Sequence, residues 1–260
     1  MARCLPLSFA GMFLGTVTSY LLNQSAELSQ FKQELQNTRN VLRMMKIGIL
    51  GSGDVGQALG RVFASHGYDV KIGSRTPDSD KLKAWLKQCQ EGQASTGTFS
   101  EAAAYGEIVV LATLGTAVEE AIKLAGPEKF EGKLVIDATN PLDFSKGMPP
   151  GLFVGTTDSL GERVQRVLTN GKVVKCFNSV HNQTMMSPMM KEGLPDMIIC
   201  GNDENAKRQV ADLLKEFGWG ESIDIGGIDG SRWLEAYVAL WVRLAMKLGN
   251  WTVAAKFLRS

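Results

Sequence analysis

The residue pattern best suited to ligand chemistry is a glycine-rich segment near position 50. Residues 51–56 read Gly-Ser-Gly-Asp-Val-Gly, between a short apolar run and an apolar stripe with helical spacing. In such a motif Gly51 permits a tight turn, Gly53 lets the main chain approach a pyrophosphate, and Gly56 allows close packing of helix on strand. The strand–loop–helix context separates the motif from a chance match. The segment therefore predicts a dinucleotide site with the phosphates at the helix N-terminus; a glycine-rich structural turn is the alternative.

A second short segment indicates which dinucleotide binds. Residues 73–76 read Gly-Ser-Arg-Thr at the end of the second predicted strand. NAD-specific sites usually carry Asp or Glu there, for the ribose 2′-hydroxyl. No carboxylate stands in this segment, and Arg75 can bind a 2′-phosphate through charge-assisted hydrogen bonds, with Ser74 and Thr76 as additional hydroxyl donors. The pattern favours NADP(H), although an arginine at a strand end is also an ordinary solvated side chain.

Side chains for the reaction itself are few. Asn140, Asn178 and His181 follow apolar strand-like runs, where open α/β sheets place their ligands. Of these, His181 most readily donates a proton near neutral pH. A hydrogen-bonded loop histidine is the simpler interpretation, and Asn178 equally suits a turn. Hydride transfer needs two planar rings held face to face at about 3–3.5 Å, and the cofactors supply the electronics. A sequence without an acid–base triad fits that chemistry.

Alternating strands and helices must carry these loops. Apolar runs of strand length occur at 46–50, 69–73, 107–112, 133–137, 172–177, 196–200 and 222–225. Helical patterns occur at 55–63, 81–90, 116–124, 159–168 and 203–217, and a long apolar helix or a broken pair at 231–258. The alternation predicts an α/β fold: a Rossmann-type doubly wound, mainly parallel sheet with a C-terminal helical extension.

Composition excludes several classes of protein. The 260 residues include 28 Lys and Arg against 27 Asp and Glu, so the chain lacks the basic surplus of a nucleic-acid binder. Two histidines and four scattered cysteines fit neither a metal site nor a disulfide scaffold. Cys176 and Cys200 stand in apolar runs, and we expect them to be small buried residues.

The N-terminal segment differs from the rest of the chain. Residues 5–22 carry no charged side chain, a length at the short end of a membrane span. Membrane association, a targeting peptide and an extension without function are three interpretations. Residues 25–43 form an amphipathic helical pattern, typical of a stalk or a linker. We therefore divide the chain into a leader at 1–44 and an NADP-binding domain at 45–260 that includes C-terminal helices at 231–258. A cytoplasmic, a membrane-associated and an organelle-targeted location all stay open.

Four segments together resemble a known family. They are MKIGILGSGDVGQALG at 45–60, KIGSRTP at 71–77, VIDATNPLD at 135–143 and VVKCFNSV at 173–180. They look like the deazaflavin (coenzyme F420)-dependent NADP oxidoreductase family. They are also similar to the NADPH-binding domain of the six-transmembrane metalloreductases.

The resemblance implies a set of cofactor contacts beyond the motif glycines. The implied contacts to the pyrophosphate, the 2′-phosphate and the nicotinamide end are, in that order, Ser52, Asp54 and Val55; Ser74, Arg75 and Thr76; and Thr113, Leu114, Asn140 and Pro141. Many relatives carry a proline directly after the strand at 107–112, where this chain has Thr113-Leu114-Gly115.

The leading hypothesis is an NADPH-dependent oxidoreductase that passes hydride to a flavin, a deazaflavin or a related small redox acceptor. An imine or β-hydroxyacid reductase begins with the same unit, but usually appends a larger helical domain than the chain after residue 225 provides. A non-catalytic NADPH-binding module tethered to a membrane partner is the third hypothesis. The apolar C-terminal pattern also suggests a homodimer. A methionine cluster suggests either an apolar wall for a flat acceptor or simple packing; its members are Met185, Met186, Met189 and Met190.

Overall fold

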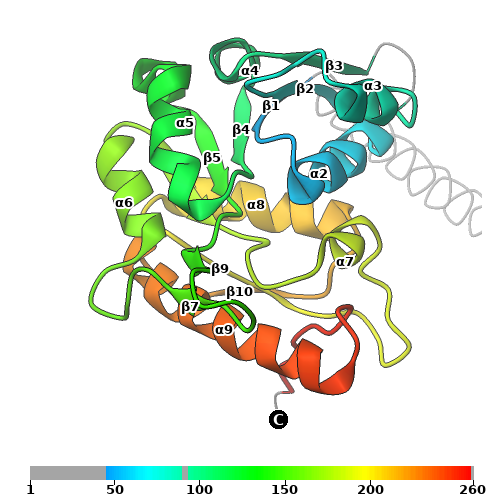
Figure 1. Ribbon diagram of the computed structural model, residues 1–260, viewed down its shortest axis with the longest axis vertical. Coiled ribbons are helices and arrows are strands. Elements are labelled where there is room, and N and C mark those ends of the chain that lie inside the picture. Colours follow the sequence, from blue (N-terminus) through cyan, green and yellow to red (C-terminus); the bar gives the residue numbers. More distant parts are fainter. Residues whose placement is uncertain (1–44, 90–92, 259–260) are drawn as a thin grey trace, which may run out of the picture. The chain divides into compact units, whose positions relative to one another are not determined.

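A computed structural model describes residues 45–89 and 93–258. An eight-stranded sheet runs through them in the order β10-β9-β8-β5-β4-β1-β2-β3 (Figure 1). Its strands are β1 (Lys46–Leu50), β2 (Asp69–Gly73), β3 (Ala94–Gly97), β4 (Ile108–Leu111), β5 (Leu134–Asp137), β8 (Lys172–Lys175), β9 (Met197–Gly201) and β10 (Ser222–Asp224). A separate antiparallel pair joins β6 (Leu142–Asp143) to β7 (Gly151–Leu152).

Neighbouring strands of the large sheet are parallel, with one exception. β8 and β9 are antiparallel, with Lys175 opposite Cys200. β4 and β5 are buried along their whole length, which is why they read as continuous apolar runs. β1 lies between β2 and β4, so the direction of winding reverses there. The predicted doubly wound, mainly parallel sheet is confirmed, and its switch point is where such folds bind ligands.

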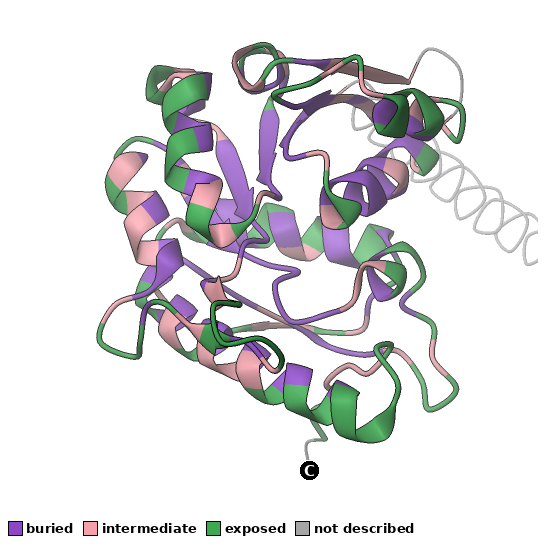
Figure 2. Cartoon of the chain, viewed as in Figure 1, coloured by how far each residue is buried: buried purple, intermediate pink, exposed green. Residues whose placement is uncertain are grey.

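Helices cover both faces of the sheet. They are α2 (Asp54–Ser65), α3 (Asp80–Leu86), α4 (Phe99–Tyr105), α5 (Val118–Ala125), α6 (Leu160–Val167), α7 (Asn182–Met186), α8 (Glu204–Glu216) and α9 (Ser231–Leu248), with 3₁₀ turns at Gly115–Ala117, Pro127–Phe130 and Ile228–Gly230. α5 packs against α4 and α6, and α2 contacts α7. In Figure 1, α5 and α6 lie to the left of β4 and β5, and α2 and α7 lie to the right. The strands between these layers are mostly buried (Figure 2).

The sequence patterns do not predict β3 or α4. β3 reads Ala-Ser-Thr-Gly and lacks the apolar residues by which a strand is recognised. α4 had a usable signal, because Thr98 and Glu101 form a capping box. The Thr98 hydroxyl accepts a hydrogen bond from the Glu101 main-chain nitrogen at 3.2 Å, and the Glu101 carboxylate accepts one from the Thr98 nitrogen at 2.7 Å.

The C-terminal helix is shorter than predicted. The sequence suggested helix across 231–258, but α9 ends at Leu248 and residues 250–258 are not helical. Gly249 follows α9 in the left-handed conformation, with φ 61°, which is a common helix stop. The prediction was wrong because it followed the apolar content of the segment past a glycine that ends the helix.

Asp196 anchors the tail after α9. Its side chain is 2% exposed and accepts hydrogen bonds from Lys256 Nζ and from the main-chain nitrogen of Phe257, both at 2.8 Å. A third comes from the Glu221 nitrogen at 3.2 Å. Burial acts to raise the pKa of Asp196, but these donors hold it below its ordinary value. The end of the described chain is therefore tied to the start of β9.

The predicted leader at 1–44 lies outside the described residues, together with its apolar segment at 5–22 and its amphipathic helix at 25–43. The domain boundary at Met45 therefore stays a prediction. Within residues 45–89 and 93–258, no helix combines the length and the apolar character needed to cross a bilayer.

Candidate functional site

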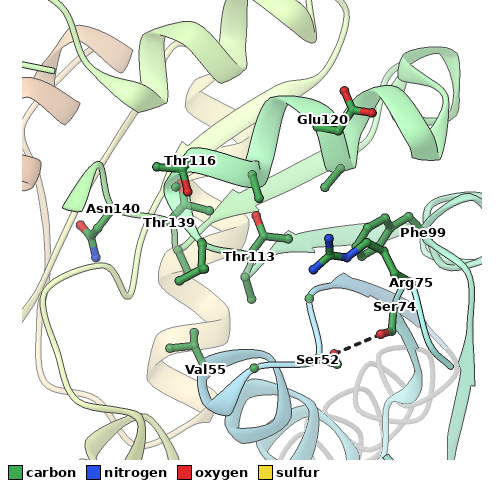
Figure 3. A pocket seen from close by; sticks show the side chains of 18 of the residues that line it. Ser52, Val55, Ser74, Arg75, Phe99, Thr113, Thr116, Glu120, Thr139 and Asn140 are labelled. Atoms are coloured by element: carbon green, nitrogen blue, oxygen red, sulfur yellow. Dashed lines mark hydrogen bonds between the residues drawn. The ribbon is translucent and has the colours of Figure 1, made fainter. Parts of the chain in front are cut away.

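A cleft of about 1040 Å³ opens at the switch point of the sheet. Its walls come from the loops after β1 (51–55), β2 (74–76), β4 (112–117) and β5 (138–140), from α5, and from residues 142–144. That volume lies at the upper end of the ~300–1000 Å³ typical of small-molecule sites. Figure 3 shows Ser74, Arg75 and Phe99 at one end of the cleft and Thr139 and Asn140 at the other. The cleft therefore suits a long ligand with two different ends.

The three motif glycines meet different surroundings. A Cβ on Gly51, where φ is +126°, would lie 2.3 Å from the carbonyl oxygen of Ala112. A Cβ on Gly56 would lie 2.0 Å from the Gly51 oxygen, so neither position admits a side chain. A Cβ on Gly53 would meet no protein atom within 4 Å. Gly53 lines the cleft, so its missing side chain leaves space there for a ligand.

Hydrogen bonds tie the glycine-rich loop to the loop after β2. The hydroxyls of Ser52 and Ser74 lie 3.1 Å apart (Figure 3). The Ser74 hydroxyl also accepts from the Thr76 nitrogen at 3.2 Å. Buried Gln57 donates through Nε2 to the main-chain oxygen of Ser52 at 2.8 Å, a support that the motif did not predict. The two loops therefore form one connected wall.

The N-terminus of α2 lies at this wall, and no side chain caps its first main-chain N–H groups. Gly53 is the N-cap residue and has no side chain to accept from the first turn. Free N–H groups at a helix N-terminus suit an anion. Asp54 would repel a phosphate, but its carboxylate pairs with Lys81 at 3.0 Å. The fit to a pyrophosphate is good.

The Arg75 end of the cleft has the donors of a phosphate site. Ser74, Arg75 and Thr76 line it, together with Phe99 from the start of α4. In the described part of the chain no carboxylate pairs with the Arg75 guanidinium. Figure 3 shows the Arg75 side chain beside Phe99. An unpaired guanidinium next to two hydroxyls suits a dianionic group.

The opposite end is built on two asparagines. Asn140 lines the cleft, and Asn178 is buried behind it. Asn178 Nδ2 donates a hydrogen bond to Asn140 Oδ1, and Asn140 Nδ2 donates one to the main-chain oxygen of Asn178. Asn178 Nδ2 also donates to the main-chain oxygen of Leu234 in α9 at 3.1 Å. Phe177, the residue before Asn178, has φ 64°, an unusual conformation for a bulky residue. This unusual main-chain conformation stands next to the hydrogen-bonded pair of Asn140 and Asn178.

A buried ion cluster lies beneath the same end. Lys175 Nζ contacts Asp137 Oδ2 at 2.9 Å and Glu235 Oε1 at 2.7 Å, and the three side chains are 0–3% exposed. Burial alone would lower the pKa of Lys175, but the two carboxylates raise it above its ordinary value. The sequence does not predict this cluster, because a lysine within an apolar strand gives no sign of its partners.

Most of the predicted cofactor residues line the cleft. Those that do are Gly51, Ser52, Gly53, Asp54, Val55, Ser74, Arg75, Thr76, Thr113, Leu114 and Asn140. Gly56 packs behind the loop, and Pro141 is buried beside the cleft without lining it. The Thr113 hydroxyl oxygen is buried and has no hydrogen-bond partner in the described structure.

The two substrate-side candidates do not line the cleft. Asn178 supports Asn140 from within the core. His181 is the N-cap residue of α7, where its Nδ1 accepts from the Gln183 nitrogen at 3.3 Å. None of the four clustered methionines lines the cleft either, and Met185 is buried. The simpler structural interpretations of these residues therefore fit better.

Several lining residues were not anticipated. They are Phe99, Thr116, Glu120, Leu124, Thr139, Leu142, Asp143 and Phe144, among others. Thr139 stands beside a predicted contact, so the parallel strand end was a usable signal for it. Phe144 lies in an irregular segment, and no periodic pattern marks it.

An open sheet with a glycine-rich turn and a nucleotide-sized cleft at its switch point defines the Rossmann class of dinucleotide-binding proteins. Residues 46–141 match the family model described as NADP oxidoreductase, coenzyme F420-dependent. The F420-dependent NADP reductase of Methanocaldococcus jannaschii is 33% identical over 211 residues, which span 78% of this chain and 93% of that protein.

Two further relatives agree with this match. A crystal structure of a candidate F420-dependent NADP reductase from Arthrobacter sp. FB24 is 38% identical, with a TM-score of 0.79 over 83% of this chain and 100% of that one. The metalloreductase STEAP3 of Rattus norvegicus is 26% identical over 191 residues, or 74% of this chain and 36% of that protein. The chain belongs to the F420-dependent NADP reductase family and is an NADP-dependent oxidoreductase.

Proposed function

We propose that the cleft binds NADP(H) in an extended form and that hydride passes between it and a flavin, a deazaflavin or a related flat acceptor. One observation carries the proposal: a single cleft joins an unpaired arginine with two hydroxyls at one end to a fixed amide side chain at the other. Ser74, Arg75 and Thr76 then hold the 2′-phosphate. The N-terminus of α2 faces the pyrophosphate.

Asn140 orients the nicotinamide end in this proposal. Its two hydrogen bonds to Asn178 leave the Asn140 amide one N–H donor and one acceptor site. Those free groups match the two polar atoms of a carboxamide. The Thr113 hydroxyl, which has no partner in the described structure, is a further donor along the same wall.

The side chains around the cleft are suited to positioning. When bound, NADPH supplies a hydride from its reduced nicotinamide ring. No histidine, cysteine or lysine lines the cleft among the described residues. The chain's task is then to bind, orient and shield, with the reacting rings about 3–3.5 Å apart.

An acceptor screen tests the proposal. Full-length protein is mixed with NADPH and, separately, F420, FMN, FAD, a quinone, a ferric chelate, a cyclic imine or a β-keto acid, and absorbance at the NADPH band is followed. We expect acceleration with a flavin or deazaflavin, and little with NADH in place of NADPH. Turnover of the imine or keto acid alone would favour the alternative reductases, and NADPH binding without turnover would favour a non-catalytic module.

We also propose that α9 mediates a homodimer. Trp233, Leu240, Leu244 and Leu248 are exposed along one side of α9, at successive spacings of seven, four and four residues. The stripe extends over about 22 Å of helix. An antiparallel pair about a twofold axis near Leu240 would bring Trp233 of each copy to Leu248 of the other. Light scattering should report a dimer that Leu240→Glu converts to a monomer; a monomeric wild type would contradict it.

A further inference from the structure

The buried cluster of Asp137, Lys175 and Glu235 joins three separate elements. Asp137 ends β5, Lys175 ends β8, and Glu235 lies in the first turns of α9. One cation therefore bridges two carboxylates, at 2.9 Å and 2.7 Å, with each side chain at most 3% exposed.

The Asp137 carboxylate also holds a wall of the cleft. Its Oδ1 accepts from the Thr139 nitrogen at 2.9 Å and from the Thr139 hydroxyl at 2.6 Å. Thr139 and the next residue, Asn140, both line the cleft. Lys175 is therefore linked through the Asp137 carboxylate to the end of the cleft proposed for the nicotinamide.

The Glu235 carboxylate fixes the other side of the cluster. Its two oxygens accept from the main-chain nitrogens of Leu160 and Gly161, at 2.8 and 2.9 Å, at the start of α6. The residue before Glu235 is Leu234, whose carbonyl receives the Asn178 amide. Asn140 follows Thr139, which is hydrogen-bonded to Asp137. Asn178 is hydrogen-bonded to Leu234, which precedes Glu235. Both asparagines are therefore connected to the ion cluster.

Stability alone does not account for three buried charged side chains, because removing charges from water costs free energy. Apolar residues of similar volume often stabilise a core as well as a buried ion pair or better. Well-oriented charges do supply fixed geometry, since each oxygen here has a defined donor. We propose that Lys175 is a positioning residue: by bridging Asp137 and Glu235 it holds the Thr139–Asn140 wall in the arrangement that orients the reacting ring. This inference rests on the proposed binding of NADP(H) in the cleft.

The test compares two buried lysines. Lys207 is also buried and bridges two carboxylates, Glu204 at 2.8 Å and Asp224 at 2.7 Å, outside the cleft. Lys175→Met and Lys207→Met are made in the full-length protein. NADPH affinity, the fluorescence anisotropy of the bound nicotinamide and kcat with the acceptor found in the screen are measured for both. Anisotropy reports how firmly the ring is held, and it needs no acceptor.

For Lys175→Met we expect NADPH affinity near that of wild type, because the Arg75 end is unchanged. We expect lower anisotropy of the bound ring and a kcat lower by about 10- to 100-fold, the size of effect that a misplaced reactant produces. Lys207→Met should lose stability without changing anisotropy or kcat. A folded Lys175→Met protein with wild-type anisotropy and kcat overturns the inference.

A gentler variant keeps the inference testable if Lys175→Met does not fold. Thr139→Val retains the shape and the ion cluster but removes the hydroxyl bond to Asp137. We expect kcat to fall by about tenfold, as for the loss of one hydrogen bond to a charged group, with lower anisotropy. Wild-type values for Thr139→Val would overturn the inference in that case. A wild-type protein that does not bind NADPH would instead overturn the proposed function and, with it, this inference.

Discussion

Asn140 and Asn178 hold each other through two reciprocal hydrogen bonds. Asn178 Nδ2 donates to Asn140 Oδ1 at 3.0 Å, and Asn140 Nδ2 donates to the main-chain oxygen of Asn178 at 2.6 Å. One of the two side chains lines the cleft and the other is 4% exposed. The loops after β5 and β8 are therefore joined at the point where the proposed nicotinamide site begins.

Asn178→Ala should separate binding from turnover. Without the Asn178 side chain, Asn140 Oδ1 loses its donor, and only the hydrogen bond from Asn140 Nδ2 to the main-chain oxygen of residue 178 still orients the Asn140 amide. We expect kcat to fall by about tenfold, as for roughly 1.4 kcal/mol of lost orientation, with NADPH affinity nearly unchanged. Steady-state kinetics and fluorescence titration measure the two effects. Asn202→Ala is the control, since it removes the hydrogen bond that Asn202 Oδ1 accepts from the main-chain nitrogen of Ile228 at 2.9 Å, outside the cleft. Equal losses of kcat in both variants would contradict the prediction.

Arg75→Ala should weaken NADPH binding far more than NADH binding. A hydrogen bond to a charged group contributes about 1.5–3 kcal/mol, so the NADPH Kd should rise by about 10- to 100-fold. NADH lacks the 2′-phosphate and should bind as before. Calorimetry with both nucleotides makes the comparison. Arg243→Ala, at an exposed position of α9, serves as the charge-matched control. Equal changes for NADPH and NADH in Arg75→Ala would remove the 2′-phosphate assignment.

Gly53→Ala and Gly56→Ala should fail in different ways. The new methyl group on Gly53 meets no protein atom within 4 Å, so the free energy of unfolding should stay near that of wild type. Because it enters ligand space, the NADPH Kd should rise by about tenfold, equivalent to roughly 1.4 kcal/mol. Gly56→Ala places its methyl 2.0 Å from the Gly51 oxygen and should destabilise the fold by about 1–3 kcal/mol.

Urea unfolding and nucleotide titration of both glycine variants check these expectations. A Gly53→Ala protein that binds NADPH normally would show that the ligand does not approach this loop.

Asp196→Asn should reveal a pH-dependent tie on the C-terminal tail. The donors around Asp196 depress the pKa of its folded-state carboxyl, so its stabilisation is present above the unfolded pKa of about 3.9 and is lost as the pH falls through the folded pKa. At pH 7 we expect Asp196→Asn to lower the free energy of unfolding by about 1.5–3 kcal/mol. The difference from wild type should narrow below about pH 4.

Urea unfolding across pH measures the Asp196 effect. Asp80→Asn is the control, because within residues 45–89 and 93–258 Asp80 forms only an exposed ion pair, with Lys83 at 3.6 Å. A difference between Asp196→Asn and wild type that does not change between pH 7 and pH 3 would contradict the assignment.

The fold was largely predictable because its local signals agree. The apolar runs that became β1, β4 and β5 are buried on both faces, so their sequences carry the burial directly. β3 could not be recognised, since an edge strand needs little apolar surface. The predicted end of α9 was wrong, because the apolar residues after Leu248 indicated a continuing helix although Gly249 ends it.

The cleft was only half predictable. Glycines mark the loop after β1, and a strand end marks the loop after β2. The sequence therefore predicts Gly53 and Arg75 as residues of the cleft. Glu235 is about 100 residues from Asp137, and only the fold brings them to the same lysine. The place of Phe144 in the cleft wall likewise depends on how distant segments pack. Residue type alone cannot reveal such tertiary relationships.

The contact between Ser52 and Ser74 has a consequence for the energetics of cofactor capture. Because two hydroxyls from separate loops meet at 3.1 Å, each loop restricts the movement of the other. Little conformational entropy then has to be lost when the ligand binds, and more of the contact energy appears as affinity. The loops after β1 and β2 thus present one preorganised surface to a ligand instead of two independent segments.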